Sequence, residues 1–511
     1  MKIWEMVKNL FRRGGDVVAN LTNGNLDSVL DHPKINLDEN EVKRVRENFR
    51  FYAGKHDKVK FRNTNGKKVE REFMGLNMTK EAASYIASLV FNEQCEIVVS
   101  RTINDNGANQ LQDANEFIQH VFNHNKFKKN FSQYLEAMFA TGGLAVRPYV
   151  DKGEVEFAWC LADTFYPLRN NTNSISECAI ANVTIRIENK KPIYYTLLEF
   201  HEWENDKYRI TNELYRSERK EKLGHQVPIN TIYENLQPVS YIRDLSRPLF
   251  GYLKPFGFNN INPRSALGLG IVDNARPTLE RINVASDEFY WEIKKGKRRR
   301  IVSDHFIQTQ VNEQGVRMQY FDDDEDTFLA LPGGLGDMVN SDITPDIRSD
   351  KYIESINHFF GILEMQIKMS AGTFTFDGQG VKTATEVVSE DSLTYRTRNS
   401  HITMIEEFIK ELIISVFELA SKTIGQDGKA LYQGEIPEWN DIGLNFDDGI
   451  FTNKNAELDY WSKALSSGIV SKKHAIQKIL NLPEKEAQRM LDEINQERPD
   501  VSLVDKELYH E

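Results

Sequence analysis

The spacing of apolar residues predicts helices in the first part of the chain. In two segments, apolar residues recur at steps of three and four, as they do on one face of a helix. They are Val42, Val45, Phe49 and Tyr52 in one segment and Phe131, Leu135, Met138 and Phe139 in the other. Gly142 and Gly143 follow the second segment, so we expect that helix to end there.

From about residue 145 to residue 216 the period of the pattern becomes two. Short runs rich in Val, Ile, Thr and Tyr follow one another: AVRPYV, EVEFAWC, CAIANVTIRI, PIYYTLLEF and KYRITNELY. Turn-prone stretches such as DKG, ENKK and WEND separate them. The pattern predicts an antiparallel meander. A loop rich in Gly, Pro and Asn, FGYLKPFGFNNINPRS, is expected to end this first large unit.

Helical spacing returns in residues 265–295, where Pro277 should kink or restart the helix, and again in residues 350–369. Between these helices lie two strand-like runs, IVSDHFIQTQ and VRMQYF, joined by NEQG. They predict a small hairpin module between two helices.

The longest helical signal begins near Thr383 and Glu386, which fit a capping box. Apolar residues then step by three and four, and no Pro or Gly occurs before Gly425. The stepping residues are Ile402, Ile405, Ile409, Leu412, Val416 and Leu419. About 38 helical residues would span roughly 57 Å. Because the first half is mostly polar, we expect this helix to bridge layers or to line an interface between chains.

Two further elements are expected after Gly425. The run DIGLNFDD alternates as a strand does. The tail should be a helical pair, with Ser471 as the N-cap of one helix and Pro483 at the start of the next.

Composition narrows the class of protein. The chain has 511 residues, of which 40% are hydrophobic, so about three globular units are expected. The 64 basic and 76 acidic residues give a net charge of −12, which disfavours general electrostatic binding to nucleic acid. Cys95, Cys160 and Cys178 show no CxxC spacing, which favours a reducing compartment. The N-terminal MKIWEMVKNLFRR is interrupted by charges and no 18 apolar residues run together, so we expect a soluble, intracellular protein.

The common enzyme motifs are not completed. Gly268-Leu-Gly270 begins like a dinucleotide fingerprint, but Asp273 stands where the third glycine should be. Residues 378–383 lack the spacing of a phosphate loop, and His201-Glu202 lacks the second histidine of a zinc protease. His120 and His124 could share a metal ion, but no third ligand is nearby, so we interpret them as ordinary surface histidines. We therefore predict no catalytic residue, cofactor or metal site.

Two charged runs flank the expected hairpin module. The basic run contains Lys294, Lys295, Lys297, Arg298, Arg299 and Arg300, and the acidic run contains Asp322, Asp323, Asp324, Glu325 and Asp326. The basic run is interpreted either as a solvated helix end, whose cations complement the helix dipole, or as a docking surface for an acidic partner. The acidic run is either a solvated turn or the partner of the basic run in an adjacent copy.

The segment from Ser370 to Lys382 joins two long helices and has glycines at 372, 378 and 380. It is expected to expose Thr373, Phe374, Thr375 and Phe376. Loops of this size between long helices are commonly functional, although a passive connector remains the alternative.

The order of these parts resembles the portal proteins of tailed bacteriophages, in particular those of siphophages of Gram-positive hosts. The most specific stretches are FYAGKHDKVKF, GLNMTKEAASYIASLVFNE, EFYWEIKKGKRRRIV and SAGTFTFDGQGVKTATEV. The resemblance implies an α+β subunit in which each part has a name. Residues 1–262 would form the wing (helical 1–143, antiparallel β 144–262), 263–299 the first stem helix, 300–346 the clip, 347–370 the second stem helix, 371–382 the tunnel loop, 383–424 the long helix, 425–451 a returning strand of the wing and 452–511 the helical crown.

The resemblance also implies a structural role without enzymatic activity. Portal subunits form a homo-oligomeric ring, usually a dodecamer, at one capsid vertex. The ring is the conduit for packaging and ejecting double-stranded DNA and docks the terminase large subunit and the head-tail adaptor. Major capsid and scaffolding proteins would be further partners. The location would be the virion, with assembly in the host cytoplasm and no membrane contact.

Particular residues receive roles by this resemblance. Contact with DNA, without sequence specificity, would fall to Thr373, Phe374, Thr375, Phe376, Gln379 and Lys382. Contacts of the clip with partners or between subunits would fall to Lys297, Arg298, Arg299 and Arg300 and to Asp322, Asp323, Asp324, Glu325 and Asp326. The acidic net charge fits this role, because a strongly basic tunnel would hold DNA instead of letting it slide. Two alternatives remain open at this point: a nucleic-acid-processing enzyme with an unrecognised metal site, and another ring-forming structural protein of the virion.

Overall fold

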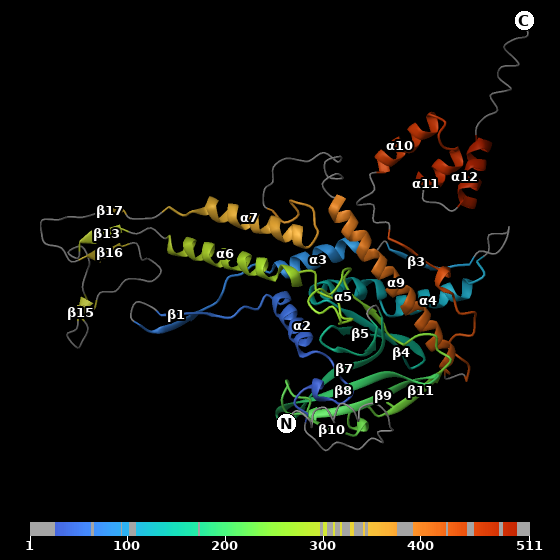
Figure 1. Ribbon diagram of the computed structural model, residues 1–511, viewed down its shortest axis with the longest axis horizontal. Coiled ribbons are helices and arrows are strands. Elements are labelled where there is room, and N and C mark those ends of the chain that lie inside the picture. Colours follow the sequence, from blue (N-terminus) through green and yellow to red (C-terminus); the bar gives the residue numbers. More distant parts are fainter. Residues whose placement is uncertain are drawn as a thin grey trace, which may run out of the picture.

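The computed structural model describes residues 26–62, 66–92, 95–101, 109–171, 174–296, 300–303, 310–311, 317–318, 328–331, 341–342, 346–375, 392–425, 428–446, 454–479 and 484–497. Figure 1 shows a body of helices and sheets from which two helices, α6 (Arg276–Lys295) and α7 (Ser349–Gln366), extend side by side. The expected α+β class is confirmed.

Helices dominate the first part of the body, as the apolar spacing predicted. The elements are α2 (Glu39–Tyr52), the hairpin of β1 (Val59–Arg62) and β2 (Lys68–Arg71), α3 (Met78–Val90), β3 (Glu96–Val99), α4 (Gln112–His124) and α5 (Phe127–Thr141), after a short 3-10 turn at Val29–Asp31. α5 ends at Gly142, whose φ of 98° lies in the left-handed region that favours glycine. The helix end predicted at Gly142 is therefore confirmed.

The predicted meander is present but is divided between two sheets. One sheet has the order β12-β4-β5, and the other has the order β10-β9-β8-β7-β6 with β11 also paired to β9. The bounds are β4 (Leu144–Asp151), β5 (Glu154–Leu161), β6 (Phe165–Asn170), β7 (Ile175–Glu188), β8 (Lys191–Glu204), β9 (Lys207–Ser217), β10 (His225–Val227), β11 (Val239–Arg243) and β12 (Gly251–Leu253). A short 3-10 turn, Ile229–Thr231, joins β10 to β11. The period of two predicts strands but carries no information on which strands pair.

The first helix of the projecting pair starts later than predicted. Residues 265–272 form a loop, a 3-10 turn covers Asp273–Ala275, and α6 begins at Arg276. Pro277 lies in the first turn, where a missing N–H costs no helical hydrogen bond, so it starts the helix without kinking it. The rings of Phe289 and Tyr352 stack with centroids 5.2 Å apart and join α6 to α7.

The segment between α6 and α7 contains more than one hairpin. β14 (Gln310–Val311) and β15 (Arg317–Met318) form the expected antiparallel hairpin. β13 (Arg300–Ser303) instead pairs in parallel with β16 (Phe328–Leu331) and antiparallel with β17 (Ser341–Asp342). The prediction of a single hairpin was therefore incomplete, because a parallel pair joins strands that are distant in sequence.

The long helix α9 (Ser392–Lys422) crosses the body and packs against α3, β4 and β12. Its predicted apolar stripe is confirmed, since Ile405, Ile409, Leu412 and Val416 are each at most 1% exposed. The capping box proposed at Thr383 and Glu386 lies outside the described residues. From Ser392 on, where the structure describes it, the polar half bridges layers within the chain: Arg398 donates from Nε to the carbonyl of Leu89 at 2.7 Å and from Nη2 to that of Phe446 at 2.9 Å.

The strand expected after Gly425 is present, and the tail contains one helix, residues 454–466, beyond the predicted pair. β18 (Ile442–Asn445), preceded by a 3-10 turn at Trp439–Asp441, pairs antiparallel with β3. The tail contains α10 (Lys454–Ser466), α11 (Lys472–Ile479) and α12 (Glu484–Glu497). Ser471 Oγ accepts the N–H of His474 at 3.2 Å, which confirms it as the N-cap of α11. Pro483 lies outside the described residues. None of the helices in the described ranges has the length and apolarity needed to cross a membrane.

Candidate functional site: the helix pair, its anchor and the loop after α7

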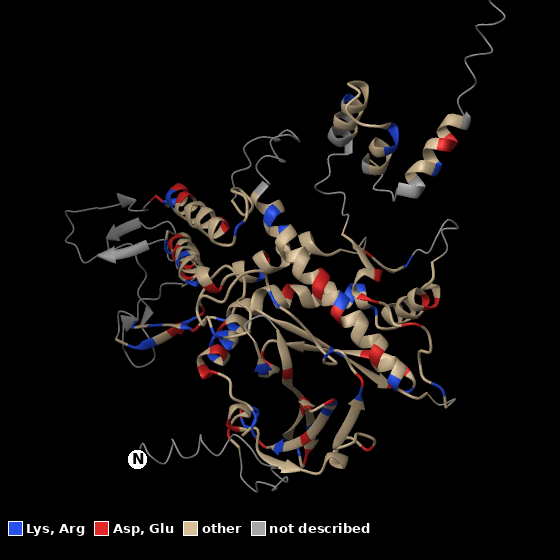
Figure 2. Cartoon of the chain, turned by 45° about the vertical axis from the view of Figure 1, so that its right-hand side comes forward, with Lys and Arg blue, Asp and Glu red and all other residues tan. Residues whose placement is uncertain are grey.

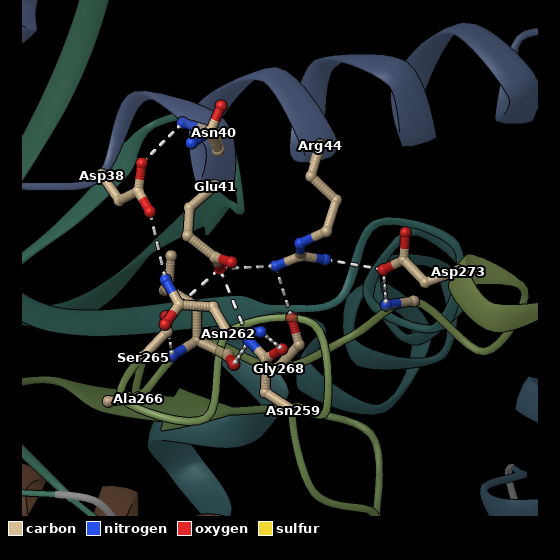
Figure 3. Close-up of polar contacts among 12 residues, drawn as sticks. Asp38, Asn40, Glu41, Arg44, Asn259, Asn262, Ser265, Ala266, Gly268 and Asp273 are labelled. Carbon is tan, nitrogen blue, oxygen red and sulfur yellow. Dashed lines mark hydrogen bonds and ion pairs between the residues drawn. The ribbon is translucent and has the colours of Figure 1, made fainter.

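A buried ionic network fixes the base of the helix pair, and Figure 3 shows its contacts. Arg44 on α2 donates from Nη1 to Asp273 Oδ2 at 2.6 Å and from Nη2 to Glu41 Oε2 at 2.9 Å. The same Nη2 reaches the carbonyl oxygen of Gly268 at 2.9 Å. Although burial alone would lower the pKa of Arg44, Asp273 and Glu41 raise it. The guanidinium therefore remains charged between two carboxylates.

Asp273 connects this network to the start of α6. Besides Arg44, its Oδ2 accepts the side-chain amide of Asn48 at 3.0 Å and the backbone N–H of Gly270 at 2.8 Å. Its Oδ1 accepts a hydrogen bond from Arg276 at 2.7 Å. Because Asp273 directly precedes α6, these bonds join α2 to the first turn of the projecting helix.

Close backbone approach completes the anchor. A Cβ atom on Gly142 would lie 2.8 Å from both the carbonyl oxygen of Gly268 and the amide nitrogen of Gly270. A Cβ atom on Gly268 would lie 2.4 Å from the carbonyl oxygen of Gly142. Gly268 and Gly270, which matched the start of a dinucleotide fingerprint, therefore allow the end of α5 to contact the segment before α6.

The β1–β2 hairpin contacts the projecting pair further out. Arg71 and Asp287 form two hydrogen bonds of 2.7 Å each, and Arg71 lowers the pKa of Asp287. The guanidinium of Arg71 also lies 4.4 Å from the ring centre of Trp291. These contacts border an open cavity of about 980 Å³, to which Phe61, Trp291, Ile347 and Tyr352 contribute apolar surface.

An ion pair closes the far end of the pair of helices. Arg348, just before α7, donates from Nη2 to Glu292 Oε2 at 2.6 Å and from Nε to Glu292 Oε1 at 3.0 Å. This contact lowers the pKa of Glu292 to about 2.

Of the predicted basic run, Lys294 and Lys295 are exposed in the last turn of α6. Of the proposed clip residues, Arg300 begins β13 and pairs in register with Phe328 and Asp342.

The remaining clip residues lie outside the described residues. They are Lys297, Arg298, Arg299, Asp322, Asp323, Asp324, Glu325 and Asp326.

The loop after α7 starts with a segment that is held in place. The sequence suggested that Thr373 and Phe374 are exposed, but both are only partly so. Thr373 Oγ1 donates to the carbonyl of Ser370 at 2.6 Å, and the ring of Phe374 meets that of Tyr85 edge-on with centroids 5.9 Å apart. Thr375 is also partly buried.

Phe376, Gln379 and Lys382 lie outside the described residues.

The backbone N–H groups of Gly372 and Phe374 donate hydrogen bonds to Glu364, which is 1% exposed. Glu364 is not among the residues predicted from the sequence, although an acidic residue in the apolar stripe of α7 was a signal for it.

The histidines singled out in the sequence bind different carboxylates. His120 Nε2 lies 3.0 Å from Glu154, and His124 Nε2 lies 2.7 Å from Glu156. Among the described residues no group of three His, Cys, Asp or Glu side chains could hold a metal ion.

A buried His–Glu pair lies between the two sheets. His201 is fully buried, with Nε2 2.6 Å from Glu199 and Nδ1 2.9 Å from the hydroxyl of Tyr208. That hydroxyl accepts the N–H of Leu249 at 3.1 Å. Burial would raise the pKa of Glu199, but Arg147 and His201 lower it to about 2. All of these hydrogen-bond partners belong to the fold itself, so we interpret the network as structural: it joins neighbouring strands.

The family comparison covers most of these elements. The model of the family described as phage portal protein, SPP1 Gp6-like, matches residues 31–500. No curated protein matches the chain.

Proposed function

The chain belongs to the SPP1 Gp6-like family of phage portal proteins, and from this membership we propose that it is the conduit for double-stranded DNA at one vertex of a phage capsid. A portal protein is a structural component of the virion and works as an oligomeric ring with capsid and packaging partners. Twelve copies are proposed here, with the terminase large subunit and the head-tail adaptor docking on the ring. The family match over residues 31–500 is the observation that carries this proposal.

The arrangement of the elements supports the assignment of parts. α6 and α7 project from the body as a stem would, and the strands between them lie at the far end, where a clip is proposed (Figure 1). The anchor at Arg44 and Asp273 would fix the stem to the wing. Figure 2 shows both basic and acidic residues on the projecting helices. Mixed charges of this kind and a net charge of −12 suit a surface along which DNA slides.

Replacing residues 375–380 with a Gly/Ser linker and Lys382 with Gln is expected to impair packaging or retention of DNA. Neutral hydrogen-bonding groups and a single lysine per copy give weak, sequence-independent contacts with DNA. Rings and their melting temperature should change little, because the replacement begins after the anchored Phe374. Encapsidated DNA measured in particles assembled with the variant checks this.

The control for the loop is a Gly/Ser replacement of residues 218–221, which are exposed in the turn after β9. It should leave both rings and packaging unchanged. If the loop variant cannot form rings, yet rings recovered under assembling conditions package DNA normally, the loop is structural and the proposed contact with DNA is wrong.

Reversing Arg298, Arg299 and Arg300 to glutamate is expected to weaken ring stability or partner docking. Exposed ion pairs contribute about 0–1 kcal/mol each, so only a network with Asp322–Asp326 of a neighbour, or with an acidic face of the terminase or adaptor, would have a measurable effect. The effect should therefore shrink as salt rises. Native mass measurement of the ring and docking assays, both across a salt series, measure the effect. Lys351→Glu, at an exposed position of α7, is the control. Unchanged assembly and docking would support the solvated helix end.

A further inference from the structure

The carboxylate of Glu364 holds the first residues of the loop after α7. Its Oε2 accepts the backbone N–H of Gly372 at 2.9 Å, and its Oε1 accepts that of Phe374 at 2.5 Å. Glu364 lies on the buried face of α7 with Phe360 and Leu363 and is 1% exposed. A carboxylate that accepts two backbone N–H groups forms charge-assisted hydrogen bonds, which are stronger than neutral ones.

The chain reverses directly after α7, which brings the loop back to Glu364. Lys368 has a φ of 60°, in the left-handed region, and Met369 N donates to the carbonyl of Glu364 at 2.8 Å. Residues 371–375 form no helix or strand, so their backbone N–H groups need acceptors from elsewhere. Glu364 supplies the acceptors for two of them.

The first turn of α9 is attached to the same point. Thr394, which is 1% exposed, accepts the N–H of Ser370 at its Oγ1 at 2.9 Å, and this hydroxyl donates to Ser370 Oγ at 3.0 Å. Thr397 Oγ1 donates to the carbonyl of Lys368 at 2.7 Å. Both helices are therefore joined to the segment that Glu364 holds.

From these contacts we infer that Glu364 is a positioning residue, which fixes the direction in which the loop leaves α7. Through Glu364 the residues from Gly372 to Phe374 are held against α7, and through Ser370 and Lys368 the preceding residues are held against α9. The inference rests on the proposed function in one respect, namely that the loop contacts double-stranded DNA.

Hydrogen exchange of the assembled ring tests the contact without reference to DNA. In Glu364→Gln one carboxylate oxygen becomes an NH₂ donor, and in Glu364→Met both acceptors are lost while the shape is nearly kept. The amides of Gly372 and Phe374 should exchange slowest in the unmodified protein, faster in Glu364→Gln and fastest in Glu364→Met, by roughly tenfold overall. Glu354→Gln, in which an exposed residue of the same helix is changed, should leave their exchange unaltered. Unaltered exchange in Glu364→Met would overturn the inference.

DNA retention in particles provides the functional readout. Glu364→Met should reduce retained DNA several-fold while ring formation stays within the range of Glu354→Gln; a purely structural role would reduce both together. Suppose that the replacement of residues 375–380 impairs DNA retention, but Glu364→Met speeds amide exchange and leaves retention normal. That result would overturn the positioning role of Glu364 and leave the proposed function standing. If that replacement also left retention normal, the proposed role of the loop would fail, whereas the exchange result would still decide whether Glu364 holds the segment.

Discussion

Arg44→Met is expected to lower the free energy of unfolding by about 3–5 kcal/mol, because it leaves the buried carboxylate of Glu41 without its cation and leaves Asp273 paired with Arg276 alone. The side chains of Glu41 and Asp273 are 2% and 0% exposed, so water cannot take the place of the guanidinium. Because methionine fills a similar volume, the loss of stability reflects the missing charge and hydrogen bonds of Arg44 more than a new cavity. Urea unfolding followed by circular dichroism measures the change.

Lys43→Met, on the adjacent residue, is the matched control. Lys43 and Glu39 form an ion pair on the same helix, but their side chains are 63% and 69% exposed. Pairs of this kind contribute about 0–1 kcal/mol. Equal losses from Arg44→Met and Lys43→Met would contradict the description of the network as the anchor of the projecting helices.

Gly142→Ala is expected to have the second large effect, about 3 kcal/mol or more. The left-handed backbone alone costs an L-residue about 1–2 kcal/mol. The added methyl group would also lie 2.8 Å from the backbone at Gly268 and Gly270, so the contact between α5 and the segment before α6 would have to open. Thermal unfolding of the purified variant measures the loss.

Gly153→Ala separates the two causes. Gly153 has a φ of 88°, close to the 98° of Gly142, but a Cβ there meets nothing within 4 Å. The control should therefore lose only the backbone contribution. If both variants lost the same stability, close packing at Gly142 would have no energetic weight.

Local patterns predicted the longer helices and strands, because a period of two or of three to four residues reflects one buried face, but they missed the short strands β1, β2 and β3 in a part that was expected to be helical. The stripe from Ile405 to Val416 and the cap at Ser471 are confirmed in this way. The boundaries that failed depend on other parts of the chain. The 3-10 turn and loop before Arg276 exist because Asp273 binds Arg44, a residue 229 positions away. No local pattern contains that contact.

The candidate site was predicted in outline only. The glycines of the loop after α7 drew attention to it, but the residue that holds its first part, Glu364, is on the preceding helix. Its role depends on a chain reversal at Lys368, which a left-handed lysine makes without any glycine or proline signal. Gly268 and Gly270 were compared with a nucleotide fingerprint, but the close approach of Gly142 to Gly268 and of Ala140 to Gly270 shows why small residues are needed there.

Native mass spectrometry of the purified protein, with negative-stain imaging of the same sample, shows directly whether this chain assembles into a portal ring. Concentration and salt should be varied, because the proposed network of clip charges would make assembly depend on ionic strength. We expect rings with a central hole and a mass that is a whole multiple of the 59.0 kDa chain, with twelve copies proposed. A monomer under every condition, together with the absence of rings from assembled particles, would contradict it.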